Sequence, residues 1–144
     1  MKSPKVYVRD SGLLHQLLGV KTEAGLLGHP RCGASLEGFA IAETLKAIRP
    51  DEAYFWATHT GAELDLLLLK DGRRLGVEVK RADAPRLTPS MRAALHDLRL
   101  EQLVVLYPGA TSYPLADRVT VHPLEEVASG LASLFPRRRR ARAG

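Results

Sequence analysis

The sequence has few of the residues that cross-link or anchor a protein. A single cysteine, Cys32, excludes a disulfide framework and a zinc site with several thiolates. No run of about 18 apolar residues could span a bilayer, and the first residues contain no apolar signal-peptide core. We therefore expect a reduced, cytoplasmic protein with no membrane contact. A phosphate loop of the form G-x-x-x-x-G-K-[ST] is also absent, which excludes a nucleotide site of that type.

Positive charge is concentrated at one end of the chain. The 144 residues hold 21 Lys and Arg against 16 Asp and Glu, and five of the arginines lie within residues 136–144. Without these five the two signs balance. We expect one domain over residues 1–135, followed by a disordered Arg-rich tail over 136–144 that attracts phosphates regardless of sequence. The alternative for the tail is a solvated terminus with no dedicated partner.

Hydrophobic periodicity and turn residues divide the chain into helices and strands. Alternation over Lys5–Val8 predicts a strand, and leucines at helical spacing predict a helix over Ser11–Leu18. After a glycine-rich loop, Ser35 is the expected N-cap of a helix over Leu36–Ile48. Beyond it we expect three strands, a helix, two strands and a closing helix at Tyr54–Thr58, Glu63–Lys70, Arg74–Arg81, Ser90–Leu98, Leu103–Tyr107, Val119–His122 and Leu124–Phe135.

The order of these elements predicts the fold class. An α-β-β-β-α-β succession is typical of an α/β protein with a mixed sheet flanked by helices. The segment Leu103–Tyr107 is apolar without alternation, as in a strand buried on both faces. Because a helix separates it from the strand at Arg74–Arg81, the connection is expected to be a right-handed crossover between parallel strands.

A hairpin turn brings the candidate site residues together. Asp71-Gly72 is a strong signal for a two-residue hairpin turn. Strand pairing around this turn joins residues whose numbers sum to 143, which puts Asp65 opposite Glu78. Since side chains alternate along a strand, Lys80 lies on the same face as Glu78. We therefore expect Asp65, Glu78 and Lys80 to form one polar patch on the sheet.

This patch predicts a metal site. Two opposed carboxylates on apolar strands repel each other, so a positive charge is expected between them. Mg²⁺ or Mn²⁺ fits, because Mg²⁺ takes one or two carboxylates and keeps waters that phosphate oxygens can replace. Lys80 beside the ion would orient a water or stabilise charge on a phosphate. The alternative is a structural sheet face on which Lys80 neutralises Glu78 or Glu63.

A third carboxylate comes from the helix before the strands. Glu37 lies in the apolar stripe formed with Ile41, Leu45 and Ile48, whereas a solvent-facing Glu belongs on the opposite side of a helix. We expect Glu37 to point toward the sheet and complete the metal site, with Glu43 as a second candidate at the margin of the stripe. The alternative for Glu37 is a first-turn carboxylate favoured by the helix dipole.

The histidines and the aromatic residues of the strand expected at Tyr54–Thr58 have ordinary structural roles as alternatives to functional ones. No two histidines are three or four residues apart, so the spacing of a zinc site is absent. His59, in the loop before the hairpin, is placed to touch a phosphate, with an ordinary loop residue as the alternative. Tyr54 and Trp56 are expected in the core rather than as stacking platforms for bases.

Several longer stretches resemble a known family. They are K-S-P-K-V-Y-V-R-D-S-G-L-L-H-Q-L-L-G at 2–19, S-L-E-G-F at 35–39, Y-F-W at 54–56, E-L-D at 63–65 and V-E-V-K at 77–80. Over residues 2–127 the chain resembles the domain of unknown function that follows the nucleotide-binding module in many prokaryotic AAA-type ATPases. The pattern of Glu37, Asp65 and Glu78-Val79-Lys80 resembles the PD-(D/E)XK nuclease superfamily. Leu64 stands where the superfamily's name has proline, and Ala57 stands where an arginine is expected.

The resemblance carries expectations about fold and activity. It implies a restriction-endonuclease-like fold over residues 1–135 and Mg²⁺-dependent hydrolysis of nucleic-acid phosphodiester bonds. Carried over by position, Glu37, Asp65 and Glu78 would hold the metal and Lys80 would assist the attacking water.

The resemblance also suggests partners. Without a phosphate loop, the chain would be a C-terminal module or remnant of an AAA-type ATPase, with the ATPase module in the same or another chain. Nucleic acid is the expected substrate, and a homodimer is allowed because superfamily members often dimerise. The alternative is a non-catalytic module that docks nucleic acid or protein for an ATPase.

Overall fold

The computed structural model describes residues 32–137, with side chains described from residue 36 onward. The strand expected at Lys5–Val8, the helix expected at Ser11–Leu18 and residues 138–144 of the Arg-rich tail lie outside this range. The elements follow the order α3 (Cys32–Ile48), β1 (Glu52–Ala57), β2 (Glu63–Lys70), β3 (Arg73–Val79), α4 (Pro89–Asp97), β4 (Gln102–Tyr107), β5 (Tyr113–Ala116), β6 (Val119–Pro123), the 3₁₀ helix η1 (Leu124–Ser129) and α5 (Leu131–Leu134). None of the described helices has the length and apolar character needed to span a membrane.

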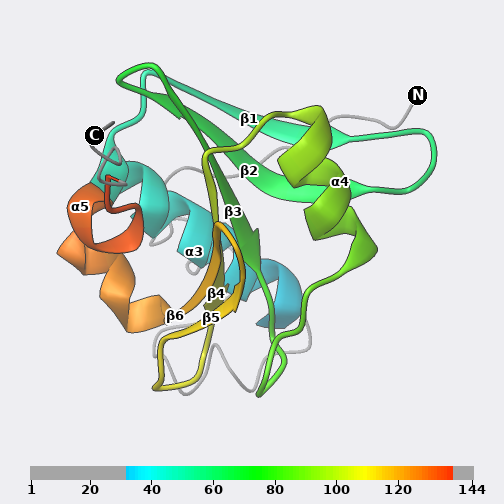
Figure 1. Ribbon diagram of the computed structural model, residues 1–144. Helices are drawn as coiled ribbons and strands as arrows, with labels where there is room; N and C mark the ends of the chain where they lie inside the picture. Colours follow the sequence, from blue (N-terminus) through cyan, green and yellow to red (C-terminus); the bar gives the residue numbers. More distant parts are fainter. Residues whose placement is uncertain (1–31, 138–144) are drawn as a thin grey trace, which may run out of the picture.

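The strands form one mixed sheet of six strands in the order β1-β2-β3-β4-β6-β5 (Figure 1). The strands β1, β2 and β3 are antiparallel neighbours, whereas β3, β4 and β6 run parallel and β5 is antiparallel to β6. All six residues of β4 are buried, as its unbroken apolar sequence predicted. The expected α/β class with a mixed sheet flanked by helices is confirmed, including the parallel pairing of β3 and β4 across α4.

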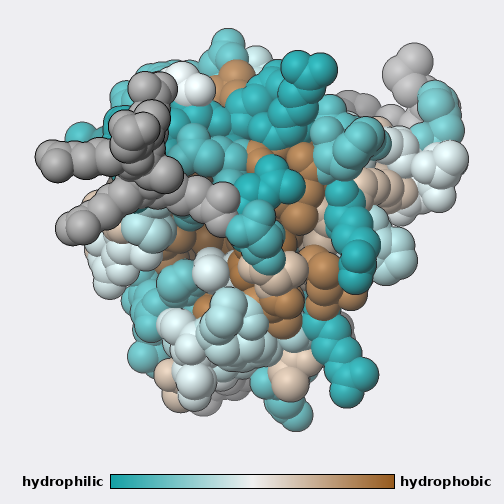
Figure 2. Space-filling view, in the orientation of Figure 1, coloured by the Kyte–Doolittle hydropathy of each residue, from teal (hydrophilic) through white to brown (hydrophobic). Residues whose placement is uncertain are grey.

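Each face of the sheet packs against its own helices. One core contains residues of α3, η1 and α5 together with β2, β3 and β4 side chains, among them Ile41, Val104 and Phe135. The second core lies under α4 and includes Met91 and Val105. Figure 1 shows α4 on the opposite side of the sheet from α3. In Figure 2 hydrophobic side chains are visible beside the position of α4 within a mostly hydrophilic surface.

The hairpin register follows the prediction. Pairing runs from Leu66 opposite Val77 to Lys70 opposite Arg73. Asp71 and Gly72 have φ angles of 52° and 75°, and positive φ at both central residues is what a type I′ turn requires. The turn thereby sets which side chains of β2 and β3 meet at the other end of the hairpin.

Two sequence predictions were wrong, and one strand was not predicted. The helix α3 begins at Cys32, so Ser35 lies within it and is not its N-cap. The closing helix expected over Leu124–Phe135 is divided at Gly130, whose φ of 84° is incompatible with a right-handed helix. The strand β5 was not predicted, because it is only four residues long and contains Pro114, which is tolerated at a sheet edge.

A buried arginine ties the C-terminal segment to the sheet. Arg73 is 6% exposed, and its Nε donates to Glu101 Oε1 at 2.9 Å while its Nη1 donates to the carbonyl of Phe135 at 2.9 Å. Its Nη2 is also 2.9 Å from Glu101 Oε1 but makes no hydrogen bond. Gln102 Nε2 donates to the carbonyl of Pro136 at 2.6 Å. The chain is thus held as far as Pro136 at the end of the sheet where β3 and β4 begin.

Arg73→Ala should lower the free energy of unfolding by about 2–3 kcal/mol, because it removes a buried charge-assisted hydrogen bond and leaves the Phe135 carbonyl without a donor. Arg74→Ala is the matched control. Arg74 is the exposed neighbour. The one described hydrogen bond of its side chain runs to the Leu98 carbonyl at 3.2 Å, and the loss of this bond should cost less than about 1 kcal/mol. Urea titrations of both variants measure the difference, and equal costs would contradict the role assigned to Arg73.

Candidate functional site

A bulge in β2 changes the course of the strand at Asp65. Tyr54 of β1 pairs with Leu67 and Trp56 pairs with Leu64, so Asp65 and Leu66 together lie opposite the single residue Phe55. A bulge of this kind bends the strand and redirects a side chain. Asp65 is therefore taken out of the simple alternation along β2 at the point where the candidate site lies.

Beyond the last backbone pair of β2 and β3, the carboxylates of Asp65 and Glu78 accept the hydrogen bonds between the two strands. Backbone pairing of these strands ends at Leu66 and Val77. At the next position the backbone N–H of Asp65 donates to Glu78 Oε2 at 3.3 Å, and the backbone N–H of Val79 donates to Asp65 Oδ2 at 2.8 Å. The two strands separate here, and each carboxylate satisfies a backbone donor that the lost ladder would otherwise leave unpaired.

Lys80 adds the positive charge of the site. Its Nζ lies 3.2 Å from Glu78 Oε1, and its side chain is 36% exposed whereas that of Glu78 is 10% exposed. Its backbone N–H donates to the carbonyl of Leu106 at 2.8 Å, which fixes Lys80 against β4. The ammonium group thus lies between buried carboxylates and solvent. Neutralisation of Glu78 by Lys80, the alternative considered from the sequence, is present in the structure.

Glu37 reaches this cluster from α3, as the apolar stripe predicted. Because α3 begins at Cys32, Glu37 is in the second turn, and the first turn contains no acidic residue. The first-turn alternative for Glu37 is therefore wrong. Its carboxylate interacts with Asp65 through charge and a hydrogen bond. The structure thus brings Glu37, Asp65, Glu78 and Lys80 together from three elements.

Burial and crowding change the protonation of the carboxylates. Asp65 is 7% exposed and Glu78 is 8% exposed. Burial and the negative charges of Glu78 and Glu37 together raise the pKa of Asp65 from 3.8 to about 8, against the opposing effect of the hydrogen bond from the Val79 N–H. Burial also raises the pKa of Glu78, although Lys80 opposes the shift. At neutral pH one proton is therefore retained within the carboxylate group, where three negative charges would face one lysine.

The described residues contain no three His, Cys, Asp or Glu side chains already spaced as a metal site. The donor chemistry nonetheless fits a hard cation, because Glu37, Asp65 and Glu78 all supply oxygen ligands. The proton retained at Asp65 indicates that the three carboxylates lack a neighbouring positive charge, which a cation would supply. The oxygens turned toward Val79 N–H and Lys80 would have to reorient to coordinate an ion. These three residues are the ones that could hold a metal in this part of the chain.

Other residues considered from the sequence lie apart from the cluster or outside the described side chains. Glu43 pairs with Lys46 at 3.5 Å on the outer part of α3. His59 is exposed in the loop between β1 and β2. Tyr54 is 49% exposed, so its expected place in the core is wrong, whereas Trp56 packs against the α4 core as predicted. The side chain of Cys32 is not among those described.

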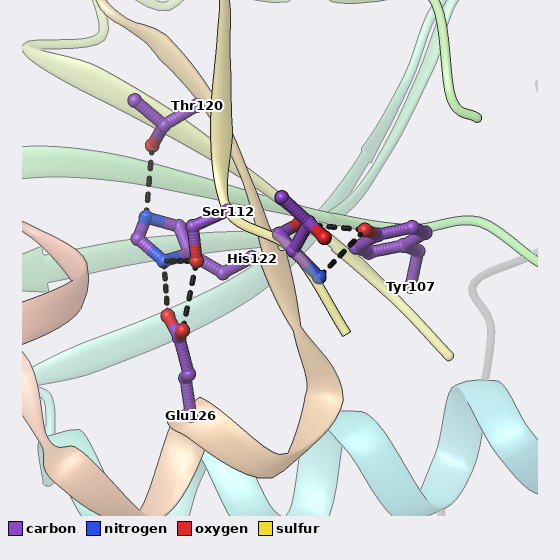
Figure 3. A network of polar contacts seen from close by, with 6 residues as sticks. Tyr107, Ser112, Thr120, His122 and Glu126 are labelled. Atoms are coloured by element: carbon purple, nitrogen blue, oxygen red, sulfur yellow. Dashed lines mark hydrogen bonds and ion pairs between the residues drawn. The ribbon is translucent and has the colours of Figure 1, made fainter. Parts of the chain in front are cut away.

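A polar network that the sequence did not predict lies on the side of β4 away from β3. His122 Nδ1 lies 2.6 Å from Glu126 Oε2, and Ser112 Oγ donates to Glu126 Oε1 at 2.8 Å (Figure 3). The Nε2 of His122 lies 3.2 Å from Thr120 Oγ1. The hydrogen bonds hold the pKa of Glu126 below its ordinary value. The spacing of four between His122 and Glu126 was an available signal, but it spans a strand end and a 3₁₀ helix rather than one helix.

Asp65→Asn should flatten the pH dependence of stability in metal-free protein. The folded state retains a proton on Asp65 that the unfolded chain releases near its ordinary pKa of 3.8. The contribution of Asp65 to stability is therefore fully present below about pH 4 and is lost as the pH rises to about 8. Asn keeps the acceptor for Val79 N–H without a charge, so the variant should be more stable than wild type at pH 8 by about 1–3 kcal/mol.

Thermal unfolding from pH 4 to pH 9 in chelator measures this difference. Asp83→Asn, at an exposed carboxylate in the loop after β3, controls for the loss of one negative charge. A profile for Asp65→Asn that runs parallel to wild type would contradict retention of the proton at Asp65.

Comparison with known proteins places the chain in a family. It is 43% identical over 126 residues to the uncharacterized protein Rv2008c of Mycobacterium tuberculosis and to the uncharacterized protein Mb2031c of Mycobacterium bovis. Each alignment covers 88% of this chain and 29% of the relative, so the chain spans less than a third of their length.

One solved structure, that of protein VC1899 from Vibrio cholerae, is similar over 76% of this chain and 34% of that one, with 10% identity. Its TM-score of 0.39 is too low to establish a shared fold. The family described as Domain of unknown function (DUF4143) matches residues 32–127, which include every residue of the carboxylate cluster and the whole sheet. The chain therefore belongs to the DUF4143 family.

Proposed function

We propose that this domain is a metal-dependent phosphodiesterase that cleaves the backbone of nucleic acid. The observation that carries the proposal is the place where β2 and β3 separate at Asp65 and Glu78, which we call the fork. There the two buried carboxylates meet a third from α3 and an adjacent lysine. A proton held within a carboxylate cluster marks a place where a cation would lower the energy. The strands β1, β2 and β3 pair antiparallel, and α4 then connects β3 to the parallel strand β4. This order agrees with a restriction-endonuclease-like core, which we include in the proposal.

Glu37, Asp65 and Glu78 would hold Mg²⁺ or Mn²⁺ in this proposal. Such an ion supplies Lewis-acid polarisation of a phosphoryl oxygen and a lower pKa for a bound water. The burial of Asp65 and Glu78 keeps bulk water away and strengthens the electrostatic interactions among the groups that remain.

Lys80 acts on the substrate side. Its half-exposed ammonium group can hydrogen-bond a phosphate oxygen from solvent, stabilise the negative charge that develops there and orient the attacking water. The ion pair with Glu78 positions the lysine before substrate arrives, and the bond from its backbone to Leu106 holds its strand in place. We further propose that the domain serves as a module of an AAA-type ATPase in the same or another chain.

A second candidate function is a non-catalytic docking module for nucleic acid or protein. The observation that favours it is the occupation of the carboxylates by two strand-capping hydrogen bonds and the Lys80 ion pair, all of which a purely structural cluster would also make. Metal binding distinguishes the two candidates.

Wild type should bind Mg²⁺ or Mn²⁺ saturably, and Asp65→Ala should abolish this binding because it removes a central ligand. Isothermal titration in chelator-treated buffer measures the affinity, and circular dichroism verifies that the variant is folded. Asp83→Ala, which removes an exposed carboxylate, is the matched control and should bind like wild type. If wild type binds neither ion at millimolar concentration, the docking module becomes the better account.

Lys80→Ala should reduce the rate of cleavage by about 10²–10³-fold, the usual effect of losing one group that stabilises transition-state charge. It should leave metal affinity within a few-fold of wild type. The assay uses single-stranded and double-stranded DNA and RNA with Mg²⁺ or Mn²⁺, and Lys46→Ala, at an exposed lysine on α3, serves as the control. Turnover of Lys80→Ala at the wild-type rate would reject the role of Lys80.

A further inference from the structure

A basic loop begins at the site, where β3 ends. Lys80 is followed by Arg81 and Arg86 in the loop 80–88, and both arginines are exposed, with Asp83 as the acidic residue between them. The loop leaves the sheet at the end of β3 and leads to α4. Positive charge therefore extends from the half-exposed lysine of the carboxylate cluster into the surrounding surface.

The two arginines of β3 do not contribute to this surface. Arg73 is buried against Glu101 and Phe135, and the guanidinium of Arg74 donates to the Leu98 carbonyl. Both lie at the start of β3, and a strand of seven residues separates them from Lys80 by roughly 20 Å. The structure thus places Arg73 and Arg74 at the start of β3, and Arg81 and Arg86 in the loop beside the site.

A tyrosine fixes the loop that carries the exposed arginines. The hydroxyl of Tyr113, on β5, donates to the carbonyl of Pro85 at 3.2 Å, and Pro85 is itself buried. The ring of Tyr113 meets that of Tyr107 edge to face, with centroids 6.1 Å apart and an interplanar angle of 88°. Pro85 immediately precedes Arg86, so this contact determines where the second arginine lies.

Tyr107 is in turn held by the loop after β4. Its hydroxyl donates to the carbonyl of Thr111 at 2.6 Å and accepts from the N–H of Thr111 at 3.1 Å (Figure 3). Gly109 lies so close to the ring that any Cβ there would collide with it. Ser112, which follows Thr111, donates a hydrogen bond from its hydroxyl to Glu126 Oε1. A continuous set of contacts therefore runs from η1 through both tyrosines to the arginine-bearing loop.

We propose that Lys80, Arg81 and Arg86 form a contact surface for the phosphates of a polynucleotide on either side of the bond at the carboxylate cluster, and that Tyr113 is the positioning residue of this surface. The proposal rests on the proposed function for its substrate class. Three cationic side chains against one acidic side chain on a short loop suit a polyanion. A loop fixed by Tyr113 loses less conformational entropy on binding than a free one.

Fluorescence polarisation of a labelled 20-nucleotide DNA or RNA strand with the full chain in chelator tests this surface without cleavage. The double variant Arg81→Ala/Arg86→Ala should raise Kd about tenfold or more and reduce the slope of log Kd against log salt by about 1.4. The matched control is Arg74→Ala/Arg99→Ala, at exposed arginines near the other end of β3, and should change Kd less than about twofold. The arginine tail is common to all variants and does not affect the comparison.

Tyr113→Phe tests positioning separately. It removes the bond to Pro85 and keeps the ring, so it should raise Kd several-fold in wild type and leave the Arg81→Ala/Arg86→Ala variant unchanged. A purely structural effect would weaken both backgrounds equally, which would overturn the role of Tyr113. Equal losses in the two arginine pairs would overturn the surface.

The outcomes separate this inference from the proposed function. Cleavage by wild type together with unchanged affinity of the Arg81→Ala/Arg86→Ala variant would overturn the surface alone. Loss of affinity in that variant together with no cleavage and no metal binding by wild type would support the surface and reject the phosphodiesterase.

Discussion

The fork between β2 and β3 is the constraint on which the site depends. Where the backbone ladder ends, two donors in the sheet would be left unpaired, and an unsatisfied buried N–H costs about 1–3 kcal/mol. The side chains of Asp65 and Glu78 provide the missing acceptors. The fold therefore uses these two carboxylates as part of its own hydrogen bonding, and the need to satisfy the strands keeps both groups buried, close together and electrostatically strained.

The need for these two acceptors explains why carboxylates occupy a buried position where apolar residues would pack more easily. Lys80 offsets part of the repulsion, and a retained proton offsets another part. Glu37 adds a third carboxylate although neither strand requires it for hydrogen bonding. The two strands need only two acceptors, so in the proposed function Glu37 is the member of the cluster that serves metal binding alone.

The parts of the molecule that depend on local sequence could be predicted, and those that depend on packing could not. The Asp71-Gly72 turn determines the hairpin register, because few residue pairs adopt positive φ at both positions. The stripe of α3 indicated that Glu37 faces the sheet. By contrast, the bulge at Asp65 follows from how β1 meets β2, and no local signal marks it. The split at Gly130, the four-residue strand β5 and the contact of Tyr113 with Pro85 likewise arise from tertiary packing.

The anchoring of the Phe135 and Pro136 carbonyls by Arg73 and Gln102 determines where the chain emerges from the domain. That point is at the strand-start edge, a full strand length from Lys80. Anything joined after Pro136 therefore begins its course on the side of the domain opposite the carboxylates. The domain could therefore be tagged, labelled or immobilised through this end of the sheet, at a distance from the carboxylate cluster.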